Sequence, residues 1–100
     1  MTQSEEIVYN HSHYNMQSWS KQANLNPIPV ARAEGIYVYD FDGNRYSDMS
    51  AQLVNLNVGH GCKPIIEAIK KQAEEYCYIS PSYGSAPRRE LAKMLVELLP

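Results

Sequence analysis

A hairpin signal near the middle of the chain constrains its fold more than any other feature. Residues 36–40 and 45–49 are rich in β-branched and aromatic side chains, as strands are. Between them, Phe41-Asp42-Gly43-Asn44 supplies an Asp-Gly pair, whose glycine tolerates the positive φ that tight hairpin turns require. The pattern therefore predicts an antiparallel hairpin at this point.

Further strands are expected on both sides of the hairpin. Pro27 and Pro29 bar a helix and favour extended structure, and the loose alternation over residues 28–34 suits an edge strand that begins near a proline. Residues 54–58 alternate apolar side chains with asparagines, a period of two that fits a third strand with one apolar face. We expect an antiparallel meander of three or four strands over about residues 28–58.

Two amphipathic helices are predicted after the meander, at about residues 64–77 and 86–99. Pro64 and Pro87 stand where a first helical turn accepts proline, because the missing N–H would lack a partner there anyway. Apolar residues then recur at three- and four-residue spacing. The stripe of the second helix consists of Leu91, Met94, Leu95 and Leu98. Strands followed by helices make the fold class α+β.

The chain is expected to hold only part of a domain. Residues 1–26 are polar with scattered apolar anchors, which favours an N-terminal arm. Ordering one hundred residues costs on the order of 100–200 kcal/mol of conformational entropy, so apolar faces must be well buried. Because nothing follows the second helix to cover its stripe, we expect residues 27–100 to be a partial small domain whose larger partner domain is absent.

Composition and charge exclude several kinds of partner. A formal net charge of -2 with only 9 Lys and Arg provides no cation cluster for nucleic acid. Residues 1–20 contain no apolar block, so we expect no secretory signal, no membrane partner and a cytoplasmic location. His11 and His13 form an H-x-H pair without a third ligand nearby, so no metal site is expected.

No residue can be assigned as catalytic from the pattern alone. The Gly59-His60-Gly61 stretch loosely resembles a dinucleotide-binding loop, but it lacks the third glycine and Pro64 removes a donor. We interpret it as a turn that initiates a helix. His60 has no carboxylate near it in sequence, so it is expected to close a turn or cap a helix. The lysines without the desolvated setting of an activated amine are Lys21, Lys70, Lys71 and Lys93.

Two segments together carry a family resemblance. Residues 35–48 read G-I-Y-V-Y-D-F-D-G-N-R-Y-S-D, and Asn57-Val58-Gly59-His60 follows before Ala68-Ile69-Lys70-Lys71-Gln72. In this order and spacing, residues 19–100 resemble class III aminotransferases, a family of fold-type-I pyridoxal-phosphate (PLP) enzymes. The resemblance implies that the chain is the N-terminal portion of the small domain of such an enzyme.

The sequence departs from the family's pattern at one point, and two of its segments resemble one subgroup of the family. Cys62 and Lys63 stand where the family commonly has the second histidine and the proline of G-H-x-H-P, which alters how the helix begins. Residues 50–57 and 19–22 resemble a subgroup described as taurine–pyruvate or other omega-amino-acid aminotransferases.

The resemblance implies a homodimer that moves an amino group from an amine or amino acid to a keto acid, with PLP as cofactor. The family's aldimine lysine, its acid for the pyridine nitrogen and its phosphate loop come later in the chain. We therefore expect residues 1–100 to hold no catalytic residue and to be inactive alone, with the cofactor-binding residues unknown.

The resemblance places four residues at the wall of the substrate pocket. Trp19 corresponds to an arm aromatic that closes over substrate, Val54 to a pocket residue at the end of the third strand, and Ser82 and Tyr83 to loop residues that reach the partner subunit's site. Simple packing remains an alternative for Val54 and Tyr83. For the whole chain, the alternative is a small non-catalytic interaction module.

Overall fold

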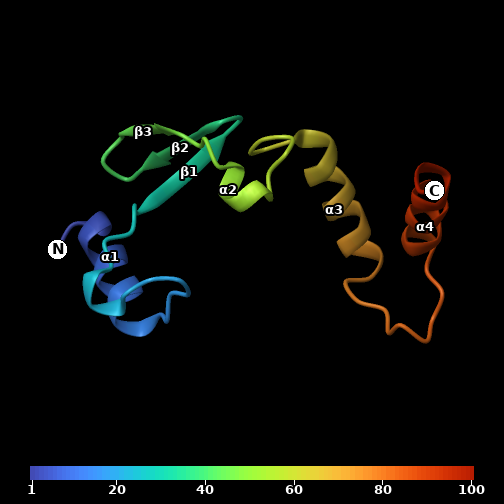
Figure 1. Cartoon of the computed structure of the whole chain (residues 1–100), viewed down its shortest axis with the longest axis horizontal. Helices are drawn as coiled ribbons and strands as arrows, with labels where there is room; N and C mark the ends of the chain where they lie inside the picture. Colours follow the sequence, from blue (N-terminus) through green and yellow to red (C-terminus); the bar gives the residue numbers. More distant parts are fainter. The chain divides into compact units, whose positions relative to one another are not determined.

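The computed structural model describes every residue, from Met1 to Pro100. The chain divides into two compact units, Met1–Cys62 and Lys63–Pro100. Figure 1 labels the elements, which are α1 (Gln3–Tyr14), the 3-10 turn η1 (Gln22–Asn24), β1 (Val30–Glu34), β2 (Tyr37–Asp40), β3 (Arg45–Ser47), α2 (Ala51–Val54), α3 (Lys63–Glu75) and α4 (Ala86–Leu98).

The sheet of the first unit confirms the predicted hairpin and edge strand. Its order is β1-β2-β3 with both pairings antiparallel, so β2 is central and β1 lies at an edge. Val38 faces Tyr46 across the hairpin, and Gly43 adopts a φ of +85° in the turn. A register shift between Val30 and Arg32 marks a bulge in β1.

One buried carboxylate fixes the hairpin turn. Asp40 is 6% exposed and accepts hydrogen bonds from the Asn44 backbone N (2.8 Å), Asn44 Nδ2 (2.9 Å), Asp42 N (3.0 Å) and Tyr46 Oη (2.8 Å). The Asn44 side-chain bond contributes most to holding the pKa of Asp40 below its ordinary value, although burial opposes it. The hydrogen bond from Tyr46 to Asp40 raises the pKa of Tyr46, because its hydroxyl must keep its proton to donate to the carboxylate.

The strand predicted over residues 54–58 is wrong, because the sheet ends at Ser47 and the chain turns into α2 instead. Side chains supply the backbone there with local partners: Asp48 Oδ1 accepts from Gln52 N at 3.2 Å, and Asn55 Nδ2 donates to Gln52 O at 2.8 Å. Such bonds compete with a strand ladder, and alternation alone does not reveal them.

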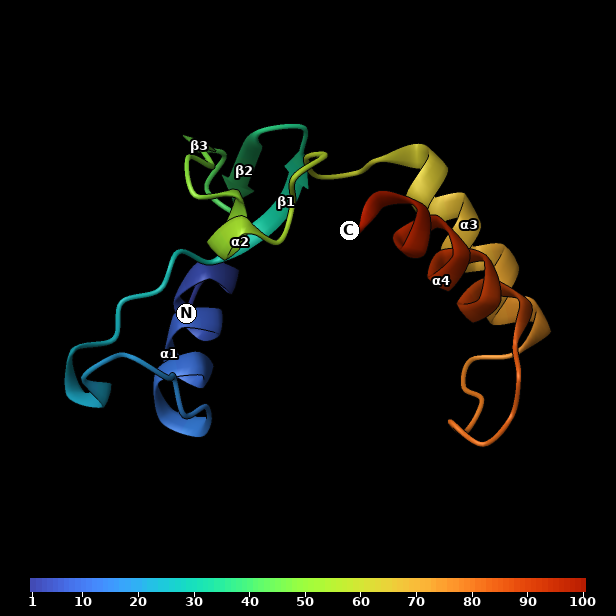
Figure 2. The same cartoon turned by 45° about the vertical axis from the view of Figure 1, so that its right-hand side comes forward.

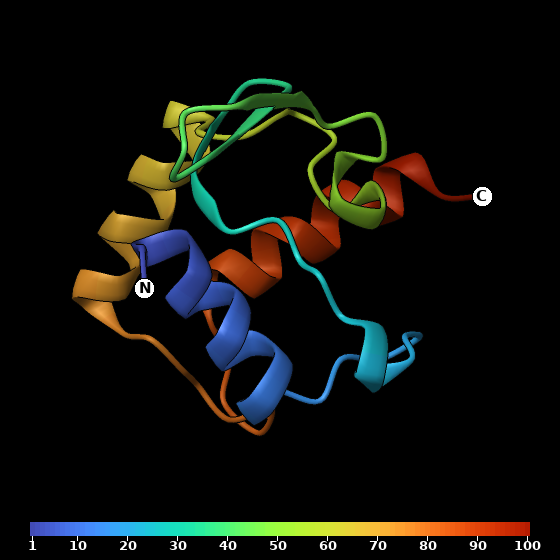
Figure 3. The same cartoon turned by 90° about the vertical axis from the view of Figure 1, so that its left-hand side faces the viewer.

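The sequence analysis also did not anticipate α1 within residues 1–26. Thr2 caps this helix by accepting from Glu5 N at 3.2 Å, and Glu5 Oε2 accepts from Thr2 N at 2.7 Å. This reciprocal pair is a capping box, whose T-x-x-E signature was present in the sequence. Figure 3 shows the chain leaving α1, passing through η1 and entering β1.

The second unit contains the two expected helices within two residues of their predicted ends. Figure 2 shows α3 running into the connecting loop and α4 returning in the opposite direction. Glu67 pairs with Lys70, one helical turn further on, at 2.9 Å on the exposed surface of α3. The predicted division between an arm (residues 1–26) and a partial small domain (residues 27–100) stays a prediction.

Very little apolar surface is buried in either unit. Val38, at 8% exposure, is the one buried hydrophobic residue of the chain. In the stripe of α4, Leu95 is 45% exposed and Leu98 is 81% exposed. No helix of the chain combines the length and the apolar character needed to cross a lipid bilayer.

Candidate functional site

The most unusual backbone of the chain is the left-handed turn formed by α2. Ala51, Gln52, Leu53 and Val54 all have positive φ, between 48° and 60°. A left-handed helical residue with a side chain costs roughly 1–2 kcal/mol, and a β-branched residue such as Val54 is a genuine outlier there. Strain of this kind persists only where neighbouring groups hold it, and it is concentrated at functional sites.

A carboxylate at the end of β3 holds the start of this turn. Asp48 Oδ1 accepts from Gln52 N at 3.2 Å and from Ser50 Oγ at 3.4 Å. Asp48 Oδ2 accepts from His60 Nε2 at 2.9 Å, and the two side chains are only 4% and 15% exposed. The hydrogen bond from His60 contributes most to lowering the pKa of Asp48, with burial opposing it. The carboxylate is therefore held ionised between the turn and His60.

The backbone of His60 is fixed to the start of the hairpin. His60 N donates to Gly35 O at 2.8 Å, and Gly35 N donates to His60 O at 3.0 Å. Gly59 packs so closely that a Cβ there would lie 3.0 Å from Gly35 O. The expectation that His60 closes a turn agrees with this bridge, but its carboxylate partner was missed because Asp48 lies 12 residues away.

A small pocket of about 310 Å³ opens beside this pair. Its lining includes both members of the pair, Ala51 from the left-handed turn and Gly35 from the bridge. The Asp48–His60 pair and the strained turn therefore line the same pocket of the first unit.

Trp19 and Val54, the predicted site residues of the first unit, present exposed side chains. Trp19 is 94% exposed with a positive φ of 58°, and Val54 is 75% exposed within the left-handed turn. Val54 thus lies in a strained turn, and not at the end of a third strand as the sequence suggested. Neither residue lines any of the pockets described here.

Ser82 and Tyr83, the predicted site residues of the second unit, lie in the loop between α3 and α4. Ser82 Oγ lies 3.1 Å from Ser80 Oγ, and Tyr83 is 68% exposed. Arg88 holds this loop by donating from Nη1 to Tyr83 O (2.9 Å) and from Nη2 to Ile79 O (3.3 Å). This role could not be predicted from the sequence, since Arg88 and Arg89 stand together as a basic pair.

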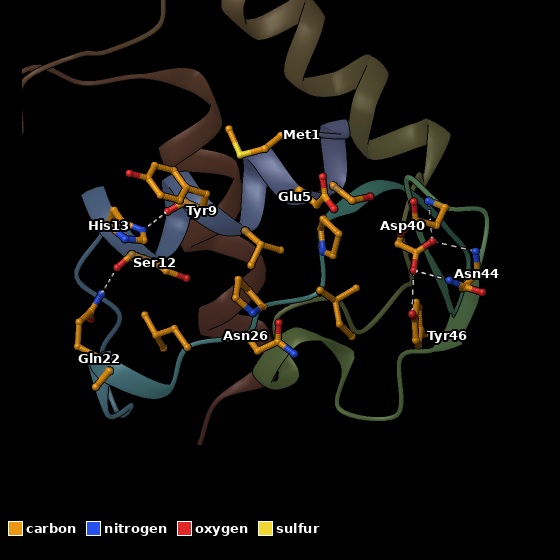
Figure 4. Close-up of a pocket in the computed structure, with 18 residues that line it drawn as sticks. Met1, Glu5, Tyr9, Ser12, His13, Gln22, Asn26, Asp40, Asn44 and Tyr46 are labelled. Atoms are coloured by element: carbon orange, nitrogen blue, oxygen red, sulfur yellow. Dashed lines mark hydrogen bonds between the residues drawn. The ribbon is translucent and has the colours of Figure 1, made fainter.

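A second hollow of the first unit is larger than the pocket beside Asp48 and His60. It has a volume of about 1370 Å³ and is lined by residues of α1, η1 and the hairpin. Figure 4 shows one group of its polar side chains bonded together, Asp40 with Asn44 and Tyr46. Ser4 Oγ and Ser12 Oγ, by contrast, are buried without a partner.

The lysines of the chain lie outside the large hollow. PLP needs a desolvated lysine for its aldimine, and the large hollow has no lysine in its lining. All the lysines of the chain are exposed, namely Lys21, Lys63, Lys70, Lys71 and Lys93. No group of three or more His, Cys, Asp or Glu is arranged to hold a metal ion.

Comparisons with known proteins agree on one family. The family model for class-III aminotransferases matches residues 18–100. The acetylornithine aminotransferase of Methanocaldococcus jannaschii is 44% identical over 72 residues, covering 72% of this chain and 18% of that protein. The taurine–pyruvate aminotransferase of Bilophila wadsworthia is 30% identical over 96 residues, covering 95% of this chain and 21% of its own length.

A solved structure extends the similarity to the fold. The crystal structure of taurine:2-oxoglutarate aminotransferase from Bifidobacterium kashiwanohense, in complex with PLP and glutamate, superposes with a TM-score of 0.88 at 49% identity. The match covers 94% of this chain and 21% of that one. This chain therefore spans about a fifth of the length of the relatives it matches. With its family model, its relatives and its fold in agreement, the chain belongs to the class III aminotransferases, whose cofactor is PLP.

Proposed function

We propose that this chain forms the N-terminal part of an aminotransferase that moves an amino group from an omega-amino acid of the taurine type to a keto acid. The supporting observation is the sequence identity with the taurine:2-oxoglutarate aminotransferase, which is 49% over 94% of the chain. Two other aminotransferases of known structure match 96% of the chain but are only 30% and 33% identical to it. The 94% match takes in most of residues 1–26, where an arm that selects substrates is expected.

In this proposal the chain selects substrate, and the rest of the enzyme performs the chemistry. PLP supplies the electron sink when it is bound. The chain contributes exposed side chains that can sort substrates by shape and hydrogen bonding: Trp19, Val54, Ser82 and Tyr83. The proposal assigns the aldimine lysine to the larger part of the enzyme, as the family resemblance implies. The proposed assembly is a homodimer, as the resemblance implies, and the proposed location is the cytoplasm.

A chimera tests this proposal. The matching 21% of the Bifidobacterium enzyme is replaced with this chain, and glutamate formation from taurine and 2-oxoglutarate is measured. We expect taurine-dependent turnover within about tenfold of the parent enzyme. The parent enzyme without that segment is the control, and it should be inactive.

The outcome that contradicts the proposal is equally definite. A chimera that forms a stable dimer and binds PLP, but transfers an amino group from no omega-amino acid, would show that this chain serves another substrate class.

A further inference from the structure

Asp48 and His60 are not assigned to substrate or cofactor by the proposed function, yet they lie where the strained turn meets the sheet. Asp48 is joined to the hairpin through its own N, which donates to Ile36 O at 2.8 Å. His60 is joined to the hairpin through its two backbone bonds with Gly35. Both members of the pair are therefore fixed to the rigid part of the unit.

The carboxylate of Asp48 connects this rigid part to the strained turn. One oxygen faces His60 at 2.9 Å, and the other accepts the amide of Gln52, the second residue of the turn, at 3.2 Å. An ionised carboxylate can accept at both oxygens at once, so the His60 bond orients the oxygen that receives the turn. Besides the carboxylate, one long backbone bond joins the turn to Asp48, from Ala51 N to Asp48 O at 3.5 Å. Other bonds of the turn, such as Val54 N to Ser50 O at 2.9 Å, lie within residues 50–56.

We propose that Asp48 and His60 act as a positioning pair for substrate selection, holding the left-handed turn in the shape that presents Val54 to the amino donor. This inference rests on the proposed function for the placement of Val54 at the substrate. Neither member touches substrate in this account; both act through the turn. Breaking the pair should therefore change donor recognition more than the rate of the chemical step.

The test uses the chimera and measures KM and kcat with taurine. The variants are His60→Gln, Asp48→Asn, the two together, and each single change in a Val54→Ala background. We expect either single change to raise the KM for taurine about fivefold while kcat changes less than about twofold. The double variant should match the singles, because removing one partner already breaks the pair. In the Val54→Ala background, His60→Gln should alter KM by less than about twofold.

The matched control is Asp42→Asn, an exposed aspartate of the hairpin turn that makes no side-chain bond to α2. It should leave the KM for taurine unchanged. An equal fall of kcat in the pair variants with KM unchanged would overturn the inference. Additive effects of His60→Gln and Val54→Ala on the KM for taurine would also overturn it.

Hydrogen exchange of residues 50–56 in the same chimera separates this inference from the proposed function, since it does not require activity. His60→Gln should speed exchange there and Asp42→Asn should not. Unchanged exchange in His60→Gln overturns the positioning role. Faster exchange together with an unaffected KM for taurine in Val54→Ala instead overturns the proposed placement of Val54.

Discussion

Gly59 carries a steric requirement that can be tested at the scale of one residue. Its φ is +80°, and a Cβ would meet Gly35 O at 3.0 Å. Gly61 has a similar φ of +73° with no atom within 4 Å of an added Cβ. Gly61→Ala should therefore cost only the left-handed penalty of about 1–2 kcal/mol.

Gly59→Ala should cost about 1–3 kcal/mol more than that penalty, because backbone atoms must also move apart. The measurement is thermal unfolding of the two variants in the chimera, where Gly59→Ala should have the lower apparent Tm. Equal Tm values would mean that the Gly35–His60 bridge is not closely packed.

The residues that could be predicted were those whose role is local in sequence. The Asp-Gly pair predicted the turn at Gly43, and Pro64 and Pro87 predicted where the two helices after the sheet begin. The Asp48–His60 pair could not be predicted, because its members are 12 residues apart and meet only after the hairpin has folded. The hydrogen bonds of Arg88 could not be predicted either, because the path of the loop determines which carbonyl groups it reaches.

At the scale of elements, the loop between α3 and α4 depends on one guanidinium. Arg88 donates to Tyr83 O and Ile79 O, whereas the neighbouring Arg89 pairs with Glu90. A lysine has a single ammonium without the fixed fork of arginine, so Arg88→Lys should lose one of the two bonds. Losing one such exposed bond costs about 1 kcal/mol.

That cost predicts amide exchange about fivefold faster for residues 79–85 in Arg88→Lys, measured in the chimera. Arg89→Lys is the matched control and should leave exchange in this loop unchanged. If both variants behaved alike, Arg88 would have no special part in holding Ser82 and Tyr83.

Element types followed from the sequence where periodicity and packing agree. The hairpin and both helices formed as expected, because alternation, turn chemistry and three- to four-residue stripes all favoured them. The error over residues 54–58 arose where side chains of Asp48 and Asn55 bond the backbone locally, which overrides alternation. Helix α1 was missed because its apolar residues form only a weak amphipathic pattern. The main sign of the helix in the sequence is the cap at Thr2.

For the whole molecule, we propose that these residues form one part of a larger enzyme. The chain spans about a fifth of its relatives and has one buried hydrophobic residue, Val38. Two-state unfolding of a hundred-residue domain requires a core of many buried side chains. In the proposed enzyme, other chain segments cover the apolar faces that this structure leaves exposed, including Leu91 and Met94 of α4.

The most direct measurement of that claim is thermal unfolding of the isolated chain, followed by calorimetry and by binding of a hydrophobic dye. We predict strong dye binding below 25 °C and a broad, non-cooperative transition, because the apolar stripes lack partners. A sharp two-state transition with no dye binding would contradict the account and would favour a self-sufficient interaction module.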